Sequence, residues 1–373
     1  MINNIQFLRF VAASLVIFAH APLNAFGVSS HTIHLGGFGV DIFFIISGFI
    51  IPYILFGASH NVSQLPKMGG VSFFIRRIVR IWPLYFVATA FVILTALIVR
   101  YSGLTPNFEV NNVYGLAKLD WTLLFESLTF THAVVAPTLN VGWTLQLEFL
   151  FYTAVAIMLL LGAKSFFHVA ISYALLLLGS ALLLGSAGAT FASYFPPLKL
   201  LATPMMIEFL FGLILYGCYL NGYFLNKWLS AALMLLIVPV FYYTELHALM
   251  SSVGGAYNRV LVWGTFAFFI VWAAISLEPH YSMPKVFSVL GDASYSLYLT
   301  HWLVLPWITF VIDRYTLYPK IGLLGLLVIC FFVCQFVALL THFFVEKPLN
   351  EKVRKVVFLR GVNRTGVQPA TVV

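Results

Sequence analysis

Charged side chains are scarce in this sequence: Asp, Glu, Lys and Arg together make up only 9% of its 373 residues. A soluble protein carries about a quarter charged residues, because its hydrophobic core has to be covered by polar groups. Hydrophobic residues reach 61% here, and phenylalanine alone occurs 37 times. So little charge cannot cover a water-exposed surface, which excludes soluble enzymes, disordered chains and nucleic-acid-binding modules.

The sequence also has few cysteines and no glycine-rich phosphate-binding loop. The three cysteines, Cys218, Cys330 and Cys334, lie inside apolar runs, so we interpret them as small core residues and not as a disulfide or zinc framework. Glycine-rich loops of the Walker or dinucleotide-binding type are missing, and a nucleotide would therefore have to be bound by side chains. His31 and His34 have the spacing of metal ligands without a third ligand nearby, so we expect no metal and no bound cofactor.

Long apolar runs take the place of these features. A membrane helix needs about 20 mostly apolar residues. The segment Trp121–Val135 is shorter and is interrupted by Glu126 and His132, so we expect it to be interfacial or re-entrant. The sequence predicts an all-α polytopic membrane protein, a bundle of about ten transmembrane helices. The ten candidate spans are approximately 5–22, 36–56, 80–100, 142–162, 165–185, 199–220, 229–246, 258–277, 288–311 and 321–345.

The distribution of Lys and Arg predicts the orientation of these spans, because cytoplasmic loops carry an excess of both. With the N-terminus in the cytoplasm, fourteen basic residues fall inside and six outside, so both termini are predicted to be cytoplasmic. We expect one membrane domain, 1–350, followed by a short basic cytoplasmic tail, 351–373. The outside residues are Arg100, Lys118, Lys199, Arg259, Arg314 and Lys320, and the inside ones are Arg9, Lys67, Arg76, Arg77, Arg80, Lys164, Lys227, Lys285, Lys347, Lys352, Arg354, Lys355, Arg360 and Arg364.

Ionisable residues inside spans are informative, since each costs about 2.5–3.5 kcal/mol at the centre of a membrane helix. Arg9 and His20 lie eleven positions apart on the first span. Eleven residues correspond to about 16 Å and close to three turns, so both side chains share one face. This helix would present a cation near the cytoplasm and an imidazole deeper in the bundle. The alternative is a snorkelling arginine and an interfacial histidine.

The second span combines small residues with one carboxylate. Gly36, Gly39 and Gly48 suit close helix packing. Asp41 lies near the outer end of this span, where it could pair with His20 of the adjacent antiparallel helix and raise the basicity of that imidazole. The alternative is an interfacial aspartate at a helix start.

A cluster of arginines, Arg76, Arg77 and Arg80, lies where the chain leaves the cytoplasm. Arg77 and Arg80 are one turn apart and could bind one polyanion together, because guanidinium groups match phosphates in bidentate geometry. The alternative is a positively charged anchor that binds lipid headgroups.

The fourth and ninth spans contribute the remaining polar side chains. Glu148 follows Trp143 into the fourth span and must be paired, protonated or exposed to water, with Gln146 and Tyr152 as possible neighbours. His301 ends a polar stripe on the ninth span that begins at residue 294. The alternatives are a structural buried glutamate and a histidine that stabilises the bundle.

These segments, in this order, resemble the acyltransferase-3 family of integral membrane acyltransferases, which includes exopolysaccharide and O-antigen acetyltransferases. The similarity covers about residues 1–350. The residues that carry it are Arg9 with His20, Gly39-Val40-Asp41-Ile42-Phe43-Phe44-Ile45-Ile46-Ser47-Gly48-Phe49, Arg77 and Arg80 leading to Pro83, Trp143-Thr144-Leu145 with Glu148, and Ser294-Tyr295-Ser296-Leu297-Tyr298-Leu299 with His301.

The resemblance implies transfer of an acyl group, usually acetyl from acetyl-CoA as co-substrate, to a hydroxyl of a glycan or small molecule. It also implies a multi-pass protein of the bacterial inner membrane, in contact with the lipid bilayer and not with nucleic acid. Acyl transfer to an alcohol needs a base, which suits His20, acting directly or becoming transiently acylated. The expected catalytic residues are His20, Glu148 and Asp41; those that bind acyl-CoA are Arg9, Arg76, Arg77 and Arg80; those that line the substrate site are Ser47, Trp143, Tyr152, Tyr295 and His301.

A transporter or flippase of a glycan or small molecule is the competing class, because ionisable groups inside spans also mark transport pathways. That class predicts inverted halves with interrupted helices in matching positions, and the sequence shows no such repeat. The oligomeric state does not follow from the sequence.

Overall fold

The computed structural model of the chain describes residues 2–58, 64–102, 107–115, 119–132, 135–186, 196–247 and 256–359. All regular secondary structure in these ranges is helical. Three basic residues used to predict the orientation, Lys118, Arg360 and Arg364, lie outside them, as does the part of the predicted tail from 360 to 373.

The helices have the following bounds. The longer ones are α1 (Asn3–His20), α3 (Phe38–Phe56), α4 (Gly70–Tyr101), α7 (Gly142–Leu160), α8 (Phe166–Ser186), α10 (Met206–Leu220), α11 (Lys227–Leu246), α13 (Thr265–Leu277), α15 (Ser294–Arg314) and α16 (Tyr318–Thr341). The shorter ones are η1 (Leu23–Phe26), α2 (Ser30–His34), η2 (Leu35–Gly37), α5 (Phe108–Tyr114), α6 (Trp121–Thr129), η4 (Pro196–Ala202), α12 (Ala256–Arg259), α14 (Lys285–Asp292) and α17 (Lys347–Arg354), with π-helical turns at Val260–Gly264, His342–Glu346 and Lys355–Leu359.

Eight helices in the described part of the chain are long and apolar enough to cross a membrane, which confirms the prediction of a multi-pass all-α membrane protein. They correspond to eight of the ten predicted spans. The two other predicted spans are α1, which has 18 residues but begins with the polar Asn3 and Asn4, and α10, which has only 15 residues. Helix α6, with nine residues, is too short to span a bilayer.

Several boundaries differ from those predicted. Helix α4 begins at Gly70, ten residues before the predicted start, so the arginine cluster lies on the helix itself, which also continues through Pro83. The charged residues hid this start, because they interrupt the apolar run that marks a span. The predicted span 199–220 is divided into η4 and α10, and the predicted span 288–311 is divided at Ala293 into α14 and α15.

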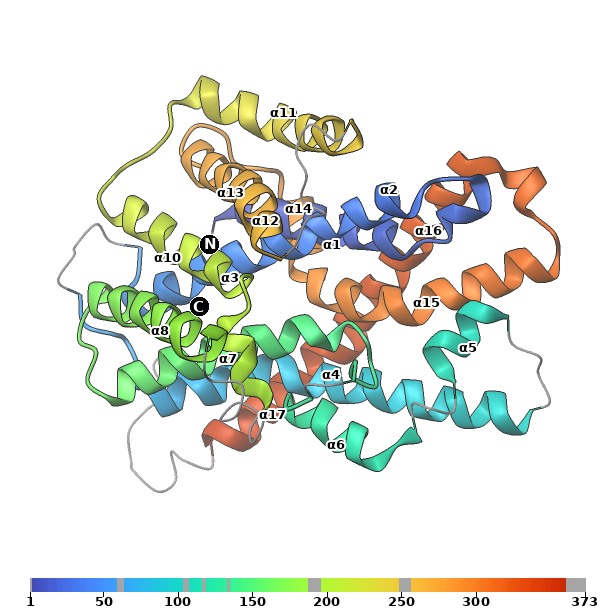
Figure 1. Cartoon of the computed structure of the whole chain (residues 1–373), viewed down its shortest axis with the longest axis horizontal. Coiled ribbons are helices and arrows are strands. Elements are labelled where there is room, and N and C mark those ends of the chain that lie inside the picture. Colours follow the sequence, from blue (N-terminus) through green and yellow to red (C-terminus); the bar gives the residue numbers. More distant parts are fainter. Residues whose placement is uncertain are drawn as a thin grey trace.

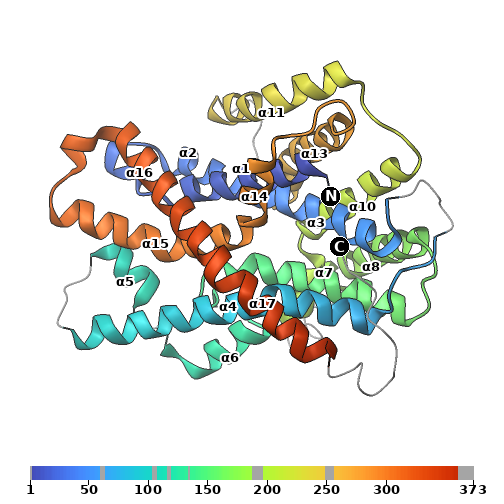
Figure 2. The same cartoon turned by 180° about the vertical axis from the view of Figure 1, so that it is seen from behind.

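Helix α1 lies in the middle of the bundle, with α11 and α13 on one side and α4 and α6 on the other (Figure 1). It packs against α3, α13, α14, α15 and α16. Helix α16 crosses the bundle and is continued by α17, which packs against α4 (Figure 2). The two ends of α1 therefore face different neighbours.

Three glycines allow other backbones to touch α1 directly. A Cβ atom on Gly36 would lie 2.6 Å from the backbone nitrogen of Ala19. A Cβ on Gly39 would overlap the carbonyl oxygen of Ala12, and one on Gly291 of α14 would overlap that of Gln6. These contacts fix the position of α1 against α3 and α14.

Helices α3 and α10 meet in the same way, through Gly48 and Gly212. A Cβ on Gly212 would lie 2.6 Å from the Cα atom of Gly48, and one on Gly48 would overlap the carbonyl oxygen of Phe209. Small residues allow this close approach, which is how many membrane helices associate. The prediction that the glycines of the second span serve close packing is confirmed.

An ion pair joins α3 to α12. The Nη2 atom of Arg259 lies 2.7 Å from Oδ2 of Asp41, and its Nε atom donates to Oδ1 at 3.2 Å. Asp41 and the neighbouring Glu208 of α10 are both fully buried, so one guanidinium faces two carboxyl groups. The expected pairing of Asp41 with His20 is wrong, because Arg259 occupies both oxygens of this carboxylate.

Gly48→Ala should destabilise the protein by about 1–3 kcal/mol, because the added methyl group overlaps backbone atoms that cannot move aside as a flexible side chain would. Thermal unfolding of the detergent-solubilised protein measures this effect. The matched control is Gly179→Ala in α8, where a Cβ would meet nothing within 4 Å. Equal unfolding temperatures for the two variants would contradict the close contact.

Arg259→Ala should destabilise the protein by about 3–5 kcal/mol, because it leaves buried carboxyl groups without their cation. Adding Asp41→Asn should recover part of the loss, which a double-mutant cycle of unfolding measures. Arg100→Ala, at an exposed arginine of α4, serves as control. Strictly additive losses for Arg259→Ala and Asp41→Asn would show that the pair contributes nothing.

Candidate active site

A cavity of about 580 Å³ lies between α1, α3, α4, α7, α15 and the C-terminal segment. Its lining includes both ends of the described chain, since Ile2 and Phe358 both contribute to it. It brings together eight of the predicted site residues, from five different helices: Arg9, Ser47, Arg76, Arg77, Arg80, Glu148, Tyr152 and Tyr295.

The arginines of this cavity form no ion pair with the acidic side chains that the structure describes. In the described part of the chain, the ion pairs are Arg259 with Asp41 and His342 with Glu346, and neither includes an arginine of the cavity. Arg9 donates from Nη1 to Oε1 of Gln6 at 2.9 Å, and Gln6 in turn donates to Oδ1 of Asp292 at 2.9 Å. Arg9 is thus held in place by neutral contacts and keeps its charge available.

One carboxylate faces these arginines. Oε1 of Glu148 accepts a hydrogen bond from Oγ of Ser47 at 2.9 Å and a second one from the hydroxyl of Tyr152. Tyr152 lies four residues further along α7, as its spacing predicts, and Ser47 comes from α3. Five guanidinium groups line the cavity together with this carboxylate and leave it strongly positive, which suits a ligand with several phosphate groups.

Tyrosine and threonine hydroxyls form the deeper wall of the cavity. The hydroxyls of Tyr298 and Thr144 lie 2.7 Å apart, and Tyr298 is also 3.3 Å from the carbonyl oxygen of Val141. Tyr295, one turn earlier on α15, donates to the carbonyl oxygen of Ile81 at 2.7 Å. These bonds join α7, α15 and α4 around the cavity.

A pair of histidines lies beyond this wall. His301 is completely buried, and its ring centroid is 5.8 Å from that of Tyr298. Its Nε2 atom lies 3.3 Å from Nδ1 of His20. His20 is exposed at the end of α1, with its ring edge against Trp302 at a centroid distance of 4.9 Å. Neither histidine lines the cavity, so they form a second polar centre next to it.

The hydrogen bonds of the pair fix where the protons lie. Nδ1 of His20 is 3.0 Å from the carbonyl oxygen of Val16, and Nδ1 of His301 is 3.1 Å from that of Leu297. A carbonyl oxygen only accepts, so both Nδ1 atoms must carry a proton. Nε2 of a neutral His301 is then a bare acceptor for the Nδ1 proton of His20. It follows that Nε2 of His20 is the nitrogen that is free to accept a proton.

The group that contacts His20 is therefore different from the one expected. Neither Asp41 nor Glu148 contacts the imidazole, because Asp41 is bound to Arg259 and Glu148 to Ser47 and Tyr152. His301 takes that place. The two histidines are 281 positions apart in the chain, and no local spacing could reveal their contact.

One residue predicted to line the substrate site does not line the cavity, and other residues that line it were not predicted. Trp143 is 36% exposed and does not line the cavity. Conversely, the cavity is lined by Asn350, the last residue of the predicted membrane domain, and by Arg354 and Phe358 of the predicted tail. Their position directly after the last predicted span could have suggested that these residues contribute to the site.

A further missed residue is Glu346, which explains part of the polar stripe on α15. It is buried, and its Oε2 atom accepts hydrogen bonds from Ser296 at 2.7 Å and from Nδ1 of His342 at 2.8 Å. A carboxylate so close to the end of an apolar run was the sequence signal that could have drawn attention to it.

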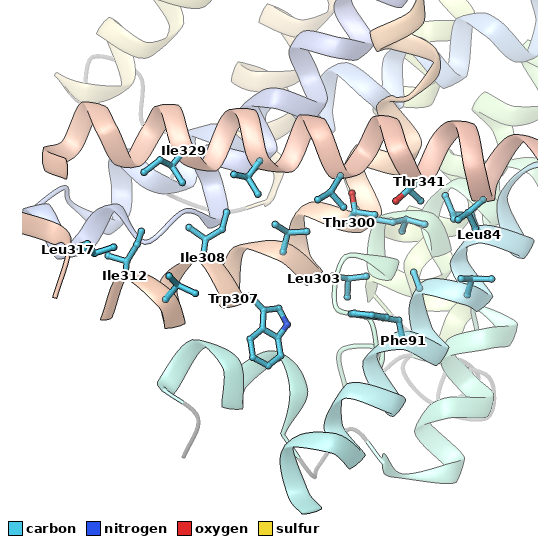
Figure 3. Close-up of a pocket in the computed structure, with 18 residues that line it drawn as sticks. Leu84, Phe91, Thr300, Leu303, Trp307, Ile308, Ile312, Leu317, Ile329 and Thr341 are labelled. Carbon is cyan, nitrogen blue, oxygen red and sulfur yellow. The ribbon is translucent and has the colours of Figure 1, made fainter. Parts of the chain in front are cut away.

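A second cavity, of about 600 Å³, lies between α4, α15 and α16. Figure 3 shows apolar side chains from all three helices pointing into it, among them Leu84, Trp307 and Ile329. The labelled polar residues, Thr300 and Thr341, carry no charge. Such a lining suits hydrocarbon and cannot neutralise phosphates, so it is not a site for a charged donor.

His132, in the loop before α7, is a second buried histidine and lines neither cavity. It is 4% exposed, and burial lowers its pKa to about 4. It is therefore neutral at physiological pH, and its carbonyl oxygen accepts from Nε2 of Gln146. Gln146 thus supports this loop and not Glu148. Among the described residues, no three His, Cys, Asp or Glu side chains gather as a metal site.

Comparison with known proteins yields two relatives. The exopolysaccharide production protein ExoZ of Rhizobium meliloti (strain 1021) is 29% identical over 278 residues, 73% of this chain and 78% of ExoZ. Nodulation protein 10 of Rhizobium leguminosarum bv. viciae is 28% identical over 325 residues, 81% of this chain and 83% of that protein. No solved structure matches the chain.

The family comparison covers almost the whole membrane bundle. A family profile described as "Acyltransferase domain" matches residues 2–342. This range includes α1 with Arg9 and His20, the arginine cluster, Glu148 and His301. The chain therefore belongs to the acyltransferase-3 family of integral membrane acyltransferases.

Proposed function

We propose that this membrane acyltransferase moves an acyl group, in the first place acetyl, from cytoplasmic acyl-CoA to a hydroxyl of a saccharide, with His20 as the base. The observation that carries the proposal is the cavity in which five arginines, none of them in an ion pair with the acidic residues that the structure describes, lie around one hydrogen-bonded carboxylate. CoA is the acyl carrier with several phosphate groups, and these fit the cations. The printed name of ExoZ, an exopolysaccharide production protein, supports a saccharide as acceptor.

The proposal also orients the bundle. Acyl-CoA is cytoplasmic, so the cavity opens on the cytoplasmic side of the bacterial inner membrane. Ile2 and Phe358 both line this cavity, which puts both ends of the described chain on that side. His20 lies at the opposite end of α1 and faces the acceptor. Donor and acceptor would thus approach one helix from its two ends.

The chemistry of the transfer follows from the proton positions. Nε2 of His20 takes the proton of the acceptor hydroxyl, whose oxygen attacks the thioester carbonyl carbon. The carbon–sulfur bond breaks, and the thiolate of CoA takes up the proton that His20 had accepted. A neutral imidazole can accept the proton of the hydroxyl and then give it up to the thiolate, so it can perform both steps. The Nδ1 proton of His20, held by Val16 and His301, keeps Nε2 directed away from its own helix.

His20→Ala should lower the rate of acetyl transfer by about 10²–10⁴-fold, the usual loss for a positioned general base. The affinity for CoA should be unchanged, because His20 does not line the donor cavity. The measurement is incorporation of labelled acetyl from acetyl-CoA into saccharide by purified protein in nanodiscs, with mass spectrometry of the product. His168→Ala, at an exposed histidine of α8, is the control. Near-normal turnover in His20→Gln would refute His20 as the base.

Two replacements of His301 test whether this residue orients the His20 imidazole or only packs against it. His301→Gln can keep an acceptor oxygen near the place of Nε2, whereas His301→Asn can keep only the donor towards Leu297. If His301 orients His20, Gln should retain at least about tenfold more turnover than Asn, because it preserves one hydrogen bond to the base. Steady-state kinetics measure this, with KM for acetyl-CoA expected to stay constant. The opposite order of the two variants would reduce His301 to a packing residue.

A further inference from the structure

The C-terminal segment contributes directly to the proposed donor cavity. It consists of α17 (Lys347–Arg354) and the π-helical turn Lys355–Leu359, and it begins five residues after the last position matched by the family profile, 342. Three of its side chains, Asn350, Arg354 and Phe358, line the cavity. The segment is thus part of the cavity wall, although it lies beyond the family domain.

Two contacts hold the segment against the arginine cluster of α4. The guanidinium of Arg76 lies over the ring of Phe358, 4.8 Å from its centroid. Nδ2 of Asn350 donates to the carbonyl oxygen of Arg80 at 3.3 Å. A cation over an aromatic face is attracted by the ring and keeps its hydrogen-bond donors free at its edge. Phe358 therefore positions Arg76 without neutralising it.

Arg354 adds a further cation to the cavity. Like Arg76, Arg77 and Arg80, it makes no ion pair with the acidic residues that the structure describes. Two buried nitrogen atoms of the cluster, Nε of Arg76 and Nε of Arg77, have no hydrogen-bond acceptor in that part of the chain. Holding four arginines together is unfavourable unless an anion with several oxygens lies between them. Phosphate groups supply such oxygens in the geometry that guanidinium groups match.

We propose that the C-terminal segment, through Arg354 and the Phe358-supported Arg76, binds phosphate groups at the nucleotide end of acyl-CoA. This inference rests on the proposed function, since it takes acyl-CoA as the donor. The segment lines the same cavity as Ile2, Tyr298 and Thr144. The nucleotide end is held there, and the pantetheine arm extends towards Tyr298 and Thr144. A membrane phospholipid offers the same phosphate chemistry, and the experiment separates the two sources.

The test uses the full-length protein in nanodiscs and calorimetric titration with CoA. Arg354→Ala should weaken CoA binding by at least about tenfold, the usual effect of removing a charged hydrogen-bond partner. Arg354→Lys should recover only part of it, because lysine lacks the planar fork. The matched controls are Lys352→Ala and Lys355→Ala, two exposed cations of the same segment that do not line the cavity. Both should bind CoA as the wild type does.

Kinetics with a truncated donor give an independent readout. KM for acetyl-CoA should rise in Arg354→Ala and in Phe358→Leu, whereas the rate with acetyl-pantetheine, which lacks the nucleotide, should not change. Arg354 is exposed, so its replacement leaves the packing of the bundle intact.

The results that would refute the proposed function differ from those that would refute only the role of the C-terminal segment. Wild-type protein that does not bind CoA would refute the proposed function itself. CoA binding that is equal in wild type and Arg354→Ala, or equally weakened in Lys352→Ala, would overturn only the role of the segment. If Arg354→Ala binds CoA normally but loses co-purifying anionic phospholipid, the segment binds a lipid headgroup and the proposal is wrong.

Discussion

The position of α1 is the constraint on which the functional groups depend. Gly36, Gly39 and Gly291 bring neighbouring backbones into contact with this helix, where any side chain would force them apart. Arg9, in the first half of α1, and His20, at its C-terminal end, are placed by these contacts. A shift of α1 would move both the cation of the donor cavity and the proposed base, so close packing in the middle of the bundle determines the geometry at its two ends.

The scarcity of charge gives each remaining charge a definite place. Asp41 and Arg259 neutralise each other and join α3 to α12, whereas the arginines of α4 and Arg354 converge on one cavity and form no ion pair with the acidic residues that the structure describes. The first arrangement stabilises the bundle, because a buried pair is costly to break. The second leaves charge for a ligand. The same low-dielectric surroundings therefore produce one structural site and one candidate binding site.

Sequence periodicity and spacing predicted what lies within single helices. The shared face of Arg9 and His20, the contact of Tyr152 with Glu148 and the close-packing glycines of the second span all follow from helical geometry. Contacts between distant helices could not be predicted in this way, because they depend on how the bundle folds. His301 next to His20, and Arg259 instead of His20 next to Asp41, are examples. Arg354 was not predicted as a site residue, because basic residues in a tail are normally interpreted as a sign of membrane orientation.

The hydrogen-bonded hydroxyls of Thr144 and Tyr298 line the arginine-lined cavity, and the Tyr298 ring lies next to His301 of the histidine pair. The membrane around such a bundle maintains an ion gradient, which a continuous water-filled passage would dissipate. A transferase that acts from both sides of a bilayer thus needs a barrier that admits an acyl group and holds back ions. Under the proposed function, Thr144 and Tyr298 would occupy the place of this barrier, and the insulation of the membrane would rest on two neutral hydroxyl groups.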